Sequence, residues 1–413
     1  MMKDVFIIGS KGVPASYGGF ETFVDNLVSH QKKEMVRYHI ACMEGSYQRD
    51  KVQKWIGSRE FVYQNAHCFE IMVPPIGAAK AVFYDLAAFQ YCISYIRKHK
   101  CNQPVVYILA CRIGPFIHMM KKQLNGFGGK LFVNPDGHEW MRGKWNAVIK
   151  KYWKYSERLM VKYADLLVCD SVTIEKYIQK EYKKYHPDTT YVAYGTDADD
   201  LATAKKYRIT EGDIELNGDK GGLIRDVLDW YRKYNLQPMH YYLIVGRFVP
   251  ENNYEYIIRD FMSSTTRQKL VIISNVEENS FYQLLRERTG FEQDERIIFA
   301  GTVYDSQLLK IIRANATAYL HGHEVGGTNP SLLEALASTQ VNILLDVGFN
   351  REVAGKAAVY FKKEQGSLVE CMKEVEDFTA DEREKYERSA KQRIRARYSH
   401  EKIVTAYEEL FLK

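Results

Sequence analysis

The segment HGHEVGGTNPSLLEA, residues 321–335, has the residue types of an anion-binding loop. Asn329 can cap a helix whose first residue is Pro330, where a missing N–H costs nothing. Gly326 and Gly327 permit positive φ and let a ligand approach the backbone closely. Free amides at a helix N-terminus favour negative charge, most naturally a phosphate. The alternative is a capped helix after a tight turn that binds nothing.

Arg247, in the segment IVGRFVPENN, could bind the same kind of ligand. It leaves a predicted strand beside a glycine, and from there a guanidinium can bind a phosphate through two hydrogen bonds. The alternative is a surface ion pair. Together with the helix N-terminus at Pro330, Arg247 would form a diphosphate clamp.

Two loops of the first half also follow predicted strands. In the first, Gly18 and Gly19 directly precede a helical pattern, but the spacing does not fit GxGxxG and argues against a nicotinamide cofactor. The alternative is a flexible loop between strand and helix. In the second, NPDGHEWMRGKW, Asp136 or His138 could contact sugar hydroxyls or transfer protons. A lone histidine is more often a surface or capping residue, so the density of ionisable groups there is the stronger signal.

Two acidic or histidine patterns do not predict a metal site. Asp197, Asp199 and Asp200 contain a D-x-D, but they fall in a polar connector, where we expect a solvated acidic turn. His321 and His323 flank a glycine, and no further ligands are spaced to complete a metal site.

These loops belong to two series of α/β units. Short apolar strands alternate with amphipathic helices, which predicts parallel sheets whose carboxyl strand ends bind ligands. The first series begins at KDVFIIGS and the second at HYYLIVGRF, with the polar residues 197–238 between them. We therefore expect two Rossmann-like domains, followed by one long charged helix in the last thirty or so residues.

Composition agrees with a large globular protein. The chain has 413 residues, 46% of them hydrophobic, and seven cysteines without regular spacing, which favours reduced thiols in a cytoplasmic setting. No secretion signal or membrane-spanning helix is expected. The net charge of +6 does not indicate nucleic acid, but it allows a basic face.

The helix predicted after residue 145 interleaves aromatic and basic residues, as interfacial helices on anionic membranes do. The candidate membrane contacts are Lys150, Lys151, Trp153 and Lys154. The alternative is an ordinary helix with its aromatics in the core and its lysines in solvent.

Taken together, these motifs resemble those of the retaining glycosyltransferases of family 4, which have the GT-B fold. GSKGVPASYGGFETFV, NPDGHEWMRGKW, GRFVPENN and HGHEVGGTNPSLLEA are similar to the bacterial rhamnosyltransferase subgroup, which builds cell-wall and capsular polysaccharides. The resemblance implies two Rossmann-like domains facing across a central cleft. We expect an acceptor-side domain at residues 1–196, a nucleotide-sugar domain at 197–394, and a C-terminal helix within 395–413 that returns to the first domain.

The resemblance also implies roles for individual residues. Asp136 and Arg247 would be catalytic, and Glu334 would accept a hydrogen bond from the nucleotide's ribose. The donor-binding residues would be Gly18, Gly19, Arg247, His323, Gly327, Thr328, Asn329 and Glu334. The acceptor side would include Tyr17, Glu21, His138 and Glu139. In two departures, Asn252 stands where the broader family has a lysine, and Gly326 where it has a glutamate.

The implied reaction is transfer of L-rhamnose from dTDP-L-rhamnose to a lipid-linked saccharide at the cytoplasmic membrane face, with retention, without cofactor or metal, and without nucleic acid. Two alternatives stay open. One keeps the fold and changes the reaction, either to a UDP-hexose-dependent transferase or to an epimerase on the same double-Rossmann architecture. The other is a degenerate subunit that binds sugar nucleotide without turning it over.

Overall fold

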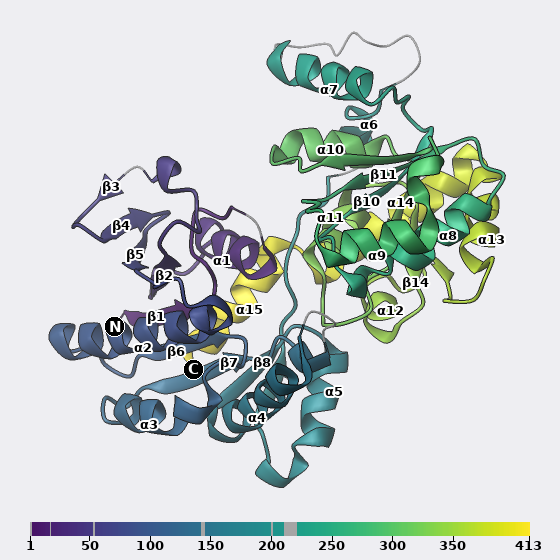
Figure 1. Cartoon of the computed structure of the whole chain (residues 1–413). Helices are drawn as coiled ribbons and strands as arrows, with labels where there is room; N and C mark the ends of the chain where they lie inside the picture. The colour runs from purple at the N-terminus through teal and green to yellow at the C-terminus, as the bar shows by residue number, and fades with distance from the viewer. Residues whose placement is uncertain (1, 17, 53, 142–144, 200, 210–220) are drawn as a thin grey trace. The chain divides into compact units, whose positions relative to one another are not determined.

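The computed structural model describes residues 2–16, 18–52, 54–141, 145–199, 201–209 and 221–413 (Figure 1). The chain forms two compact α/β units. The first comprises Met1–Gly195, Gly326–Asn329 and His400–Lys413, and the second comprises Thr196–Val325 and Pro330–Ser399.

The first unit is built on a nine-stranded sheet with the order β3-β4-β5-β2-β1-β6-β7-β8-β9. The strands are β1 (Lys3–Ile8), β2 (Val36–Met43), β3 (Lys54–Trp55), β4 (Glu60–Tyr63), β5 (Ala66–Ile71), β6 (Val105–Leu109), β7 (Lys130–Asn134), β8 (Leu166–Cys169) and β9 (Thr189–Tyr191). Strand β4 pairs antiparallel with both β3 and β5 at one edge, which the sequence pattern did not predict, and the other pairings are parallel.

Helices cover this sheet because its central strands consist mainly of buried apolar residues. β6 is buried at every residue, as expected for a parallel strand with helices on both faces. The helices are α1 (Gly19–Ser29), α2 (Lys80–His99), α3 (Gly114–Asn125), α4 (Ala147–Tyr163), α5 (Val172–Glu181) and α15 (His400–Leu412).

The second unit has a six-stranded parallel sheet with the order β12-β11-β10-β13-β14-β15. Its strands are β10 (Tyr241–Val245), β11 (Lys269–Ile273), β12 (Ile297–Gly301), β13 (Ala318–His321), β14 (Asn342–Leu345) and β15 (Val359–Phe361). Its helices are α6 (Leu201–Lys205), α7 (Gly221–Lys233), α8 (Tyr254–Ser263), α9 (Ser280–Thr289), α10 (Ser306–Ala314), α11 (Pro330–Ser338), α12 (Gly348–Ala354), α13 (Ser367–Glu376) and α14 (Ala380–Arg397).

Alternate residues of β10 pack into two separate hydrophobic clusters. Tyr242 and Ile244 pack into one cluster, and Tyr241 and Leu243 pack into the other. This period of two shows that both faces of the sheet are covered. The two Rossmann-like units confirm the predicted fold class.

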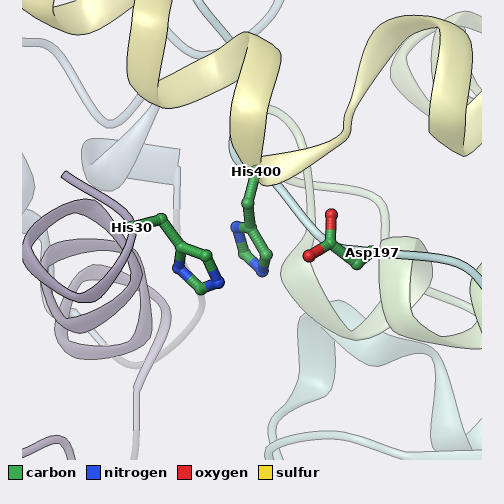
Figure 2. A group of neighbouring side chains, drawn as sticks. All are labelled: His30, Asp197 and His400. Carbon is green, nitrogen blue, oxygen red and sulfur yellow. The ribbon is translucent and has the colours of Figure 1, made fainter. Parts of the chain in front are cut away.

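The C-terminal segment differs from the single long helix that was expected. Helix α14 ends at Arg397, and α15 starts at His400 as part of the first unit. There α15 contacts α1, β1 and β2, and the ring of His400 stacks on that of His30 at the end of α1, with centroids 4.4 Å apart. Figure 2 shows these two rings together with Asp197. The break arises because the chain leaves one unit for the other at this point.

Phe411→Ala tests how far α15 supports the first unit. Phe411 is fully buried and its ring lies against those of Tyr38, Tyr107 and Phe132. The loss of apolar contact and the resulting cavity should lower the free energy of unfolding by about 3–5 kcal/mol in urea titrations. Glu409→Ala, on the exposed side of the same helix, is the control and should cost at most about 1 kcal/mol. Equal stability of the two variants would contradict this role of α15.

Candidate functional site

The loop after β1 is held by acidic residues of α1. Glu21 is buried and its Oε1 accepts a hydrogen bond from the amide of Lys11 at 2.7 Å. Gly18 has a φ of 136°, and a Cβ there would lie 1.9 Å from Oε2 of Glu21. Gly19 begins α1, whereas Tyr17 lies outside the described residues. Glu21 therefore fixes the glycine loop, and its place on the acceptor side stays a prediction.

The loop after β7 has an unusual backbone. Asp136, Gly137 and His138 have φ values of 59°, 84° and 53°, so three successive residues are left-handed. The amide of Asp136 donates to Oδ1 of Asn134, and a Cβ on Gly137 would lie 2.4 Å from Cδ1 of Ile174. Residues other than glycine rarely adopt a left-handed backbone conformation because it is strained. Strained backbone of this kind is often found at functional sites.

Side chains of α4 and α5 pack against the residues of this loop and of the turn that follows it. Lys154 Nζ lies 4.6 Å from the ring centroid of Trp140, and the ring of His138 lies 4.1 Å from that of Tyr177. Lys154 and Tyr177 both donate hydrogen bonds within a network around the buried carboxylate of Glu157. Burial, and then the charge of Lys154, lower the pKa of His138, so this ring is neutral at pH 7.

These contacts correct part of the predicted membrane face. Trp153 is only 8% exposed and belongs to the interior, and Lys154 is engaged in the network around Glu157. Trp153 therefore cannot contact a membrane, and Lys154 is held by its contacts with Glu157, Tyr177 and Glu181. Lys151 is exposed and Lys150 is half-buried, so both remain candidates.

Arg112, which the sequence interpretation did not include, lies between the β1 and β7 loops because β6 runs between those strands. Its Nη1 donates to the carbonyl oxygen of Gly9 at 2.8 Å and lies 3.3 Å from Oδ2 of Asp85, which is fully buried. Burial raises the pKa of Asp85 to about 6, although the charge of Arg112 opposes this shift. Burial would lower the pKa of Arg112, but Asp85, Asp136 and Glu139 raise it. These carboxylates therefore lie near one guanidinium.

Glu139 has a contact of its own in the same region. Its Oε1 accepts a hydrogen bond from Nε1 of Trp145 at 2.9 Å. Glu139 begins the short 3-10 helix Glu139–Met141, whose last amide donates to the carbonyl oxygen of His138. The turn thus fixes the carboxylate next to the left-handed segment.

In the second unit, Arg247 follows β10 by two residues and is exposed. Its carbonyl oxygen accepts hydrogen bonds from Nδ2 of Asn252 at 2.6 Å and from the hydroxyl of Tyr254 at 3.1 Å. Among the residues that the structure describes, no hydrogen bond or ion pair uses its guanidinium. Hydrogen bonds therefore fix the backbone at Arg247, while its guanidinium is available to bind a ligand.

Asn252, at the position where the broader family has a lysine, fixes the side chain of His323. Its Oδ1 lies 2.8 Å from Nδ1 of His323, so the two side chains are hydrogen bonded. The carbonyl oxygen of His323 accepts a hydrogen bond from Nδ2 of Asn350, and its ring lies edge-on to that of Phe349. His323 is therefore fixed in orientation near the end of β13.

Helix α11 begins at Pro330, as predicted, and its first turn is tied to the end of β10. Ser331 Oγ donates to the carbonyl oxygen of Val245 at 2.8 Å. Arg247 is two residues further along the chain, so the arginine and the helix start lie at the same strand end.

Glu334 has a partner that the sequence did not indicate. Nη2 of Arg313, a buried residue of α10, lies 2.6 Å from Oε2 of Glu334. The ion pair fixes the carboxylate, and its side chain remains 37% exposed, so one face can still accept a hydrogen bond from a ligand.

Gly326–Asn329, the loop before α11, belongs to the first unit. Thr328 is buried and its hydroxyl donates to the carbonyl oxygen of Asp170, while a Cβ on Gly327 would lie 1.8 Å from Oδ1 of Asp170. Only a glycine fits at position 327. The amides of Gly327 and Thr328 donate no hydrogen bond to other described residues, which keeps them available to an anion.

The structure accounts for Asp199 and His321 from the two patterns described above. Asp199 pairs with Lys310, and Asp200 lies outside the described residues. His321 is buried, and burial lowers its pKa to about 3, so it carries no charge at neutral pH.

Two parts of the chain match different protein families. Residues 2–197 match a family described as a domain of unknown function, DUF1972, and residues 231–395 match the family of glycosyl transferases group 1. No curated protein matches the chain.

Several solved structures are similar over the full length. Sucrose-phosphate synthase from Thermosynechococcus elongatus has a TM-score of 0.75 at 14% identity, covering 100% of this chain and 98% of its own. Anabaena HepE in complex with UDP has a TM-score of 0.67 at 12% identity, covering 99% of each chain. An E. coli trehalose-6-phosphate structure bound with UDP-2-fluoro glucose has a TM-score of 0.68 at 10% identity, covering 99% of this chain and 98% of its own.

The pH dependence of stability should report the burial of His321. Its folded-state pKa of about 3 lies below the ordinary value of 6.5, so protons bind preferentially to the unfolded chain between these values. The free energy of unfolding should be largest above pH 6.5 and should fall by about 3 kcal/mol as the pH is lowered to about 4. His321→Gln should remove this part of the pH dependence in urea titrations. His118→Gln, at an exposed position, is the control, and equal slopes for both variants would contradict the assignment.

Proposed function

We propose that this chain, which has the GT-B fold and matches the glycosyl transferases group 1 family at residues 231–395, is a glycosyltransferase that takes its sugar from a nucleotide-sugar donor. One observation carries the proposal. The exposed guanidinium of Arg247 and the N-terminus of α11 lie at the same end of β10, joined through Ser331 and Val245. This arrangement suits the diphosphate of such a donor.

The chemistry requires stabilisation of a leaving group. When the bond from the sugar carbon to the diphosphate breaks, negative charge grows on the phosphate while the sugar becomes oxocarbenium-like. Arg247 can bind two phosphate oxygens at once, and the dipole of α11 favours the same charge. The amides of Gly327, Thr328 and Asn329 would complete the phosphate site. None of these groups requires a metal ion or cofactor.

Three residues whose orientation the structure fixes would contact the ribose and the sugar of the donor. Glu334, aligned by Arg313, would accept a hydrogen bond from the ribose of the nucleotide. His323, aligned by Asn252, would contact the donor sugar in place of the family glutamate that Gly326 replaces. Asp136, held in a left-handed backbone, would accept a hydrogen bond from the sugar.

For stereochemistry, we propose retention through attack on the face from which the phosphate leaves. The departing phosphate would itself accept the proton of the acceptor hydroxyl. A pair of carboxylates spaced as in retaining hydrolases is then unnecessary.

The donor we propose is dTDP-L-rhamnose, with a lipid-linked saccharide as acceptor in bacterial surface-polysaccharide synthesis. The four motifs that resemble the rhamnosyltransferase subgroup support this choice. A UDP-hexose donor is the alternative, favoured by the similar folds that contain UDP or UDP-2-fluoro glucose. A subunit that binds sugar nucleotide without transfer is the third reading, because the family lysine and glutamate are replaced.

A donor screen separates these readings. Wild type should transfer sugar from dTDP-L-rhamnose to a membrane lipid extract, and Arg247→Ala should lower kcat by about 100-fold or more because leaving-group stabilisation is lost. Arg286→Ala, an exposed arginine of the same unit, should leave kcat unchanged. Activity with UDP-glucose alone would replace the rhamnose assignment. Binding of donors by calorimetry without any transfer would favour the subunit reading.

We further propose that the first unit contacts the cytoplasmic face of the membrane through α4. Its exposed residues recur at helical spacing and combine apolar with basic side chains: Val148, Lys151, Tyr155, Arg158 and Lys162. Such a face suits the interface of an anionic bilayer. No helix in the described part of the chain is long and apolar enough to span a membrane.

Charge reversal tests this surface. Lys150→Glu combined with Lys151→Glu should weaken binding to vesicles containing phosphatidylserine by about 30-fold or more, since each basic residue near the surface contributes about 1 kcal/mol. The control is Lys98→Glu with Lys100→Glu, which makes the same charge change at the end of α2. Sedimentation with vesicles at low salt measures both, and equal partitioning of the two variants would exclude α4 as the contact.

A further inference from the structure

Arg112 and Asp85 lie at the position of the first sheet where a ligand is most readily bound. Strand β1 is flanked by β2 on one side and by β6 on the other, so the connections that leave β1 and β6 diverge. In open parallel sheets, ligands bind outside the carboxyl strand ends at such a point. Arg112 joins the two loops there, because its Nη1 donates to the carbonyl oxygen of Gly9.

Three groups from neighbouring helices fix the arginine and its loop. The hydroxyl of Tyr152 on α4 donates to the carbonyl oxygen of Arg112 at 2.7 Å. The hydroxyl of Tyr84 on α2 donates to the carbonyl oxygen of Ser10 at 2.7 Å. The carboxylate of Asp85, also on α2, lies 3.3–3.4 Å from Nη1 of Arg112. The guanidinium is therefore held in one orientation.

The rest of the guanidinium remains available. Its side chain is 19% exposed, and within the described residues no hydrogen bond uses Nε or Nη2. The hydroxyl of Ser10 in the adjoining loop is buried and likewise has no hydrogen-bond partner there. Stability alone does not require this arrangement, since a buried ion pair can often be replaced by apolar residues without loss. The free donors and the unpaired hydroxyl point to a bound ligand.

The surrounding charges identify the class of ligand. Asp85 offsets the charge of Arg112, and the carboxylates of Asp136 and Glu139 lie close enough to interact with it electrostatically. A phosphate or carboxylate placed here would meet these acids. A sugar hydroxyl, in contrast, can accept a hydrogen bond from the guanidinium and donate one to a carboxylate.

We propose that Arg112 binds a neutral saccharide, the acceptor of the transfer reaction, by donating from Nε and Nη2 to its oxygens, with Asp85 as the residue that positions Arg112. The assignment of the saccharide as acceptor rests on the proposed function. The presence of a neutral saccharide site does not, and it can be tested without a donor.

The first experiment measures the binding of glycosides to the protein. Wild type is titrated, without donor, with octyl β-D-glucoside and octyl N-acetyl-β-D-glucosaminide, and with octyl β-D-glucuronide as the anionic counterpart, using saturation-transfer NMR. At least one neutral glycoside should bind, and more tightly than the glucuronide. Arg112→Ala should weaken its binding about tenfold or more, because a hydrogen bond to a charged donor is lost. Arg97→Ala, at an exposed position of α2, should leave binding unchanged.

Asp85→Asn separates positioning from folding. It should weaken glycoside binding less than Arg112→Ala does, and the double variant should bind no more weakly than Arg112→Ala alone, because both changes act through one group. Arg112→Lys should restore part of the affinity. Additive losses, or loss of binding in parallel with a lower melting temperature, would indicate a structural role only and would overturn the proposal.

Kinetics then test the role of the saccharide as acceptor. Arg112→Ala should raise the KM for the acceptor glycoside about tenfold while leaving hydrolysis of the donor by water within about twofold of wild type. Equal losses of donor hydrolysis and of transfer would place Arg112 at the donor instead. Binding of neutral glycosides by a wild type that turns over no nucleotide sugar would reject the proposed function and keep the saccharide site. Tighter binding of the glucuronide, or binding of neither neutral glycoside, would overturn the site itself.

Discussion

Burial of parallel strands on both faces is the constraint on which both units depend. Every strand of the second sheet, and most of the first, pairs in parallel, so helices must cover each side. Side chains in the middle of a strand are consequently mostly apolar, as in β6, although His39 of β2 is buried and hydrogen bonded to Asp4. The polar residues of the candidate site lie in the loops that leave the carboxyl strand ends. Asp136, Arg112 and Arg247 all occupy such loops.

This constraint explains why much of the architecture could be predicted. Apolar runs bounded by glycine or polar residues predicted the parallel strands, and the start of α11 at Pro330 followed from local capping preferences. Both depend on short-range properties of the sequence. The break at Tyr398 and Ser399 could not be predicted in this way, because no helix-breaking residue marks it. The helix ends where the chain passes from one compact unit to the other.

The partners of the polar residues were the least predictable part. Glu334 pairs with Arg313, and Arg112 pairs with Asp85, from elements distant in sequence. Neither ion pair can be recognised from a pattern of neighbouring residues in the sequence. Arg112 itself could have been found, since it closely follows the apolar strand PVVYILA and so meets the criterion that singled out Arg247. The aromatic and basic residues around Trp153 predict an exposed helix face. Trp153 instead shares a buried face of α4 with Glu157 and Met160.

Helix α15 makes the order of synthesis matter for folding. The first unit gains its last helix only after the whole second unit has left the ribosome, because residues 196–399 lie between them, apart from the loop 326–329. Until then the side chains that α15 covers, Tyr38, Tyr107 and Phe132, have no partner from that helix. The nascent N-terminal half must therefore persist with an incomplete core during translation, a state in which exposed aromatic surface favours chaperone binding or aggregation.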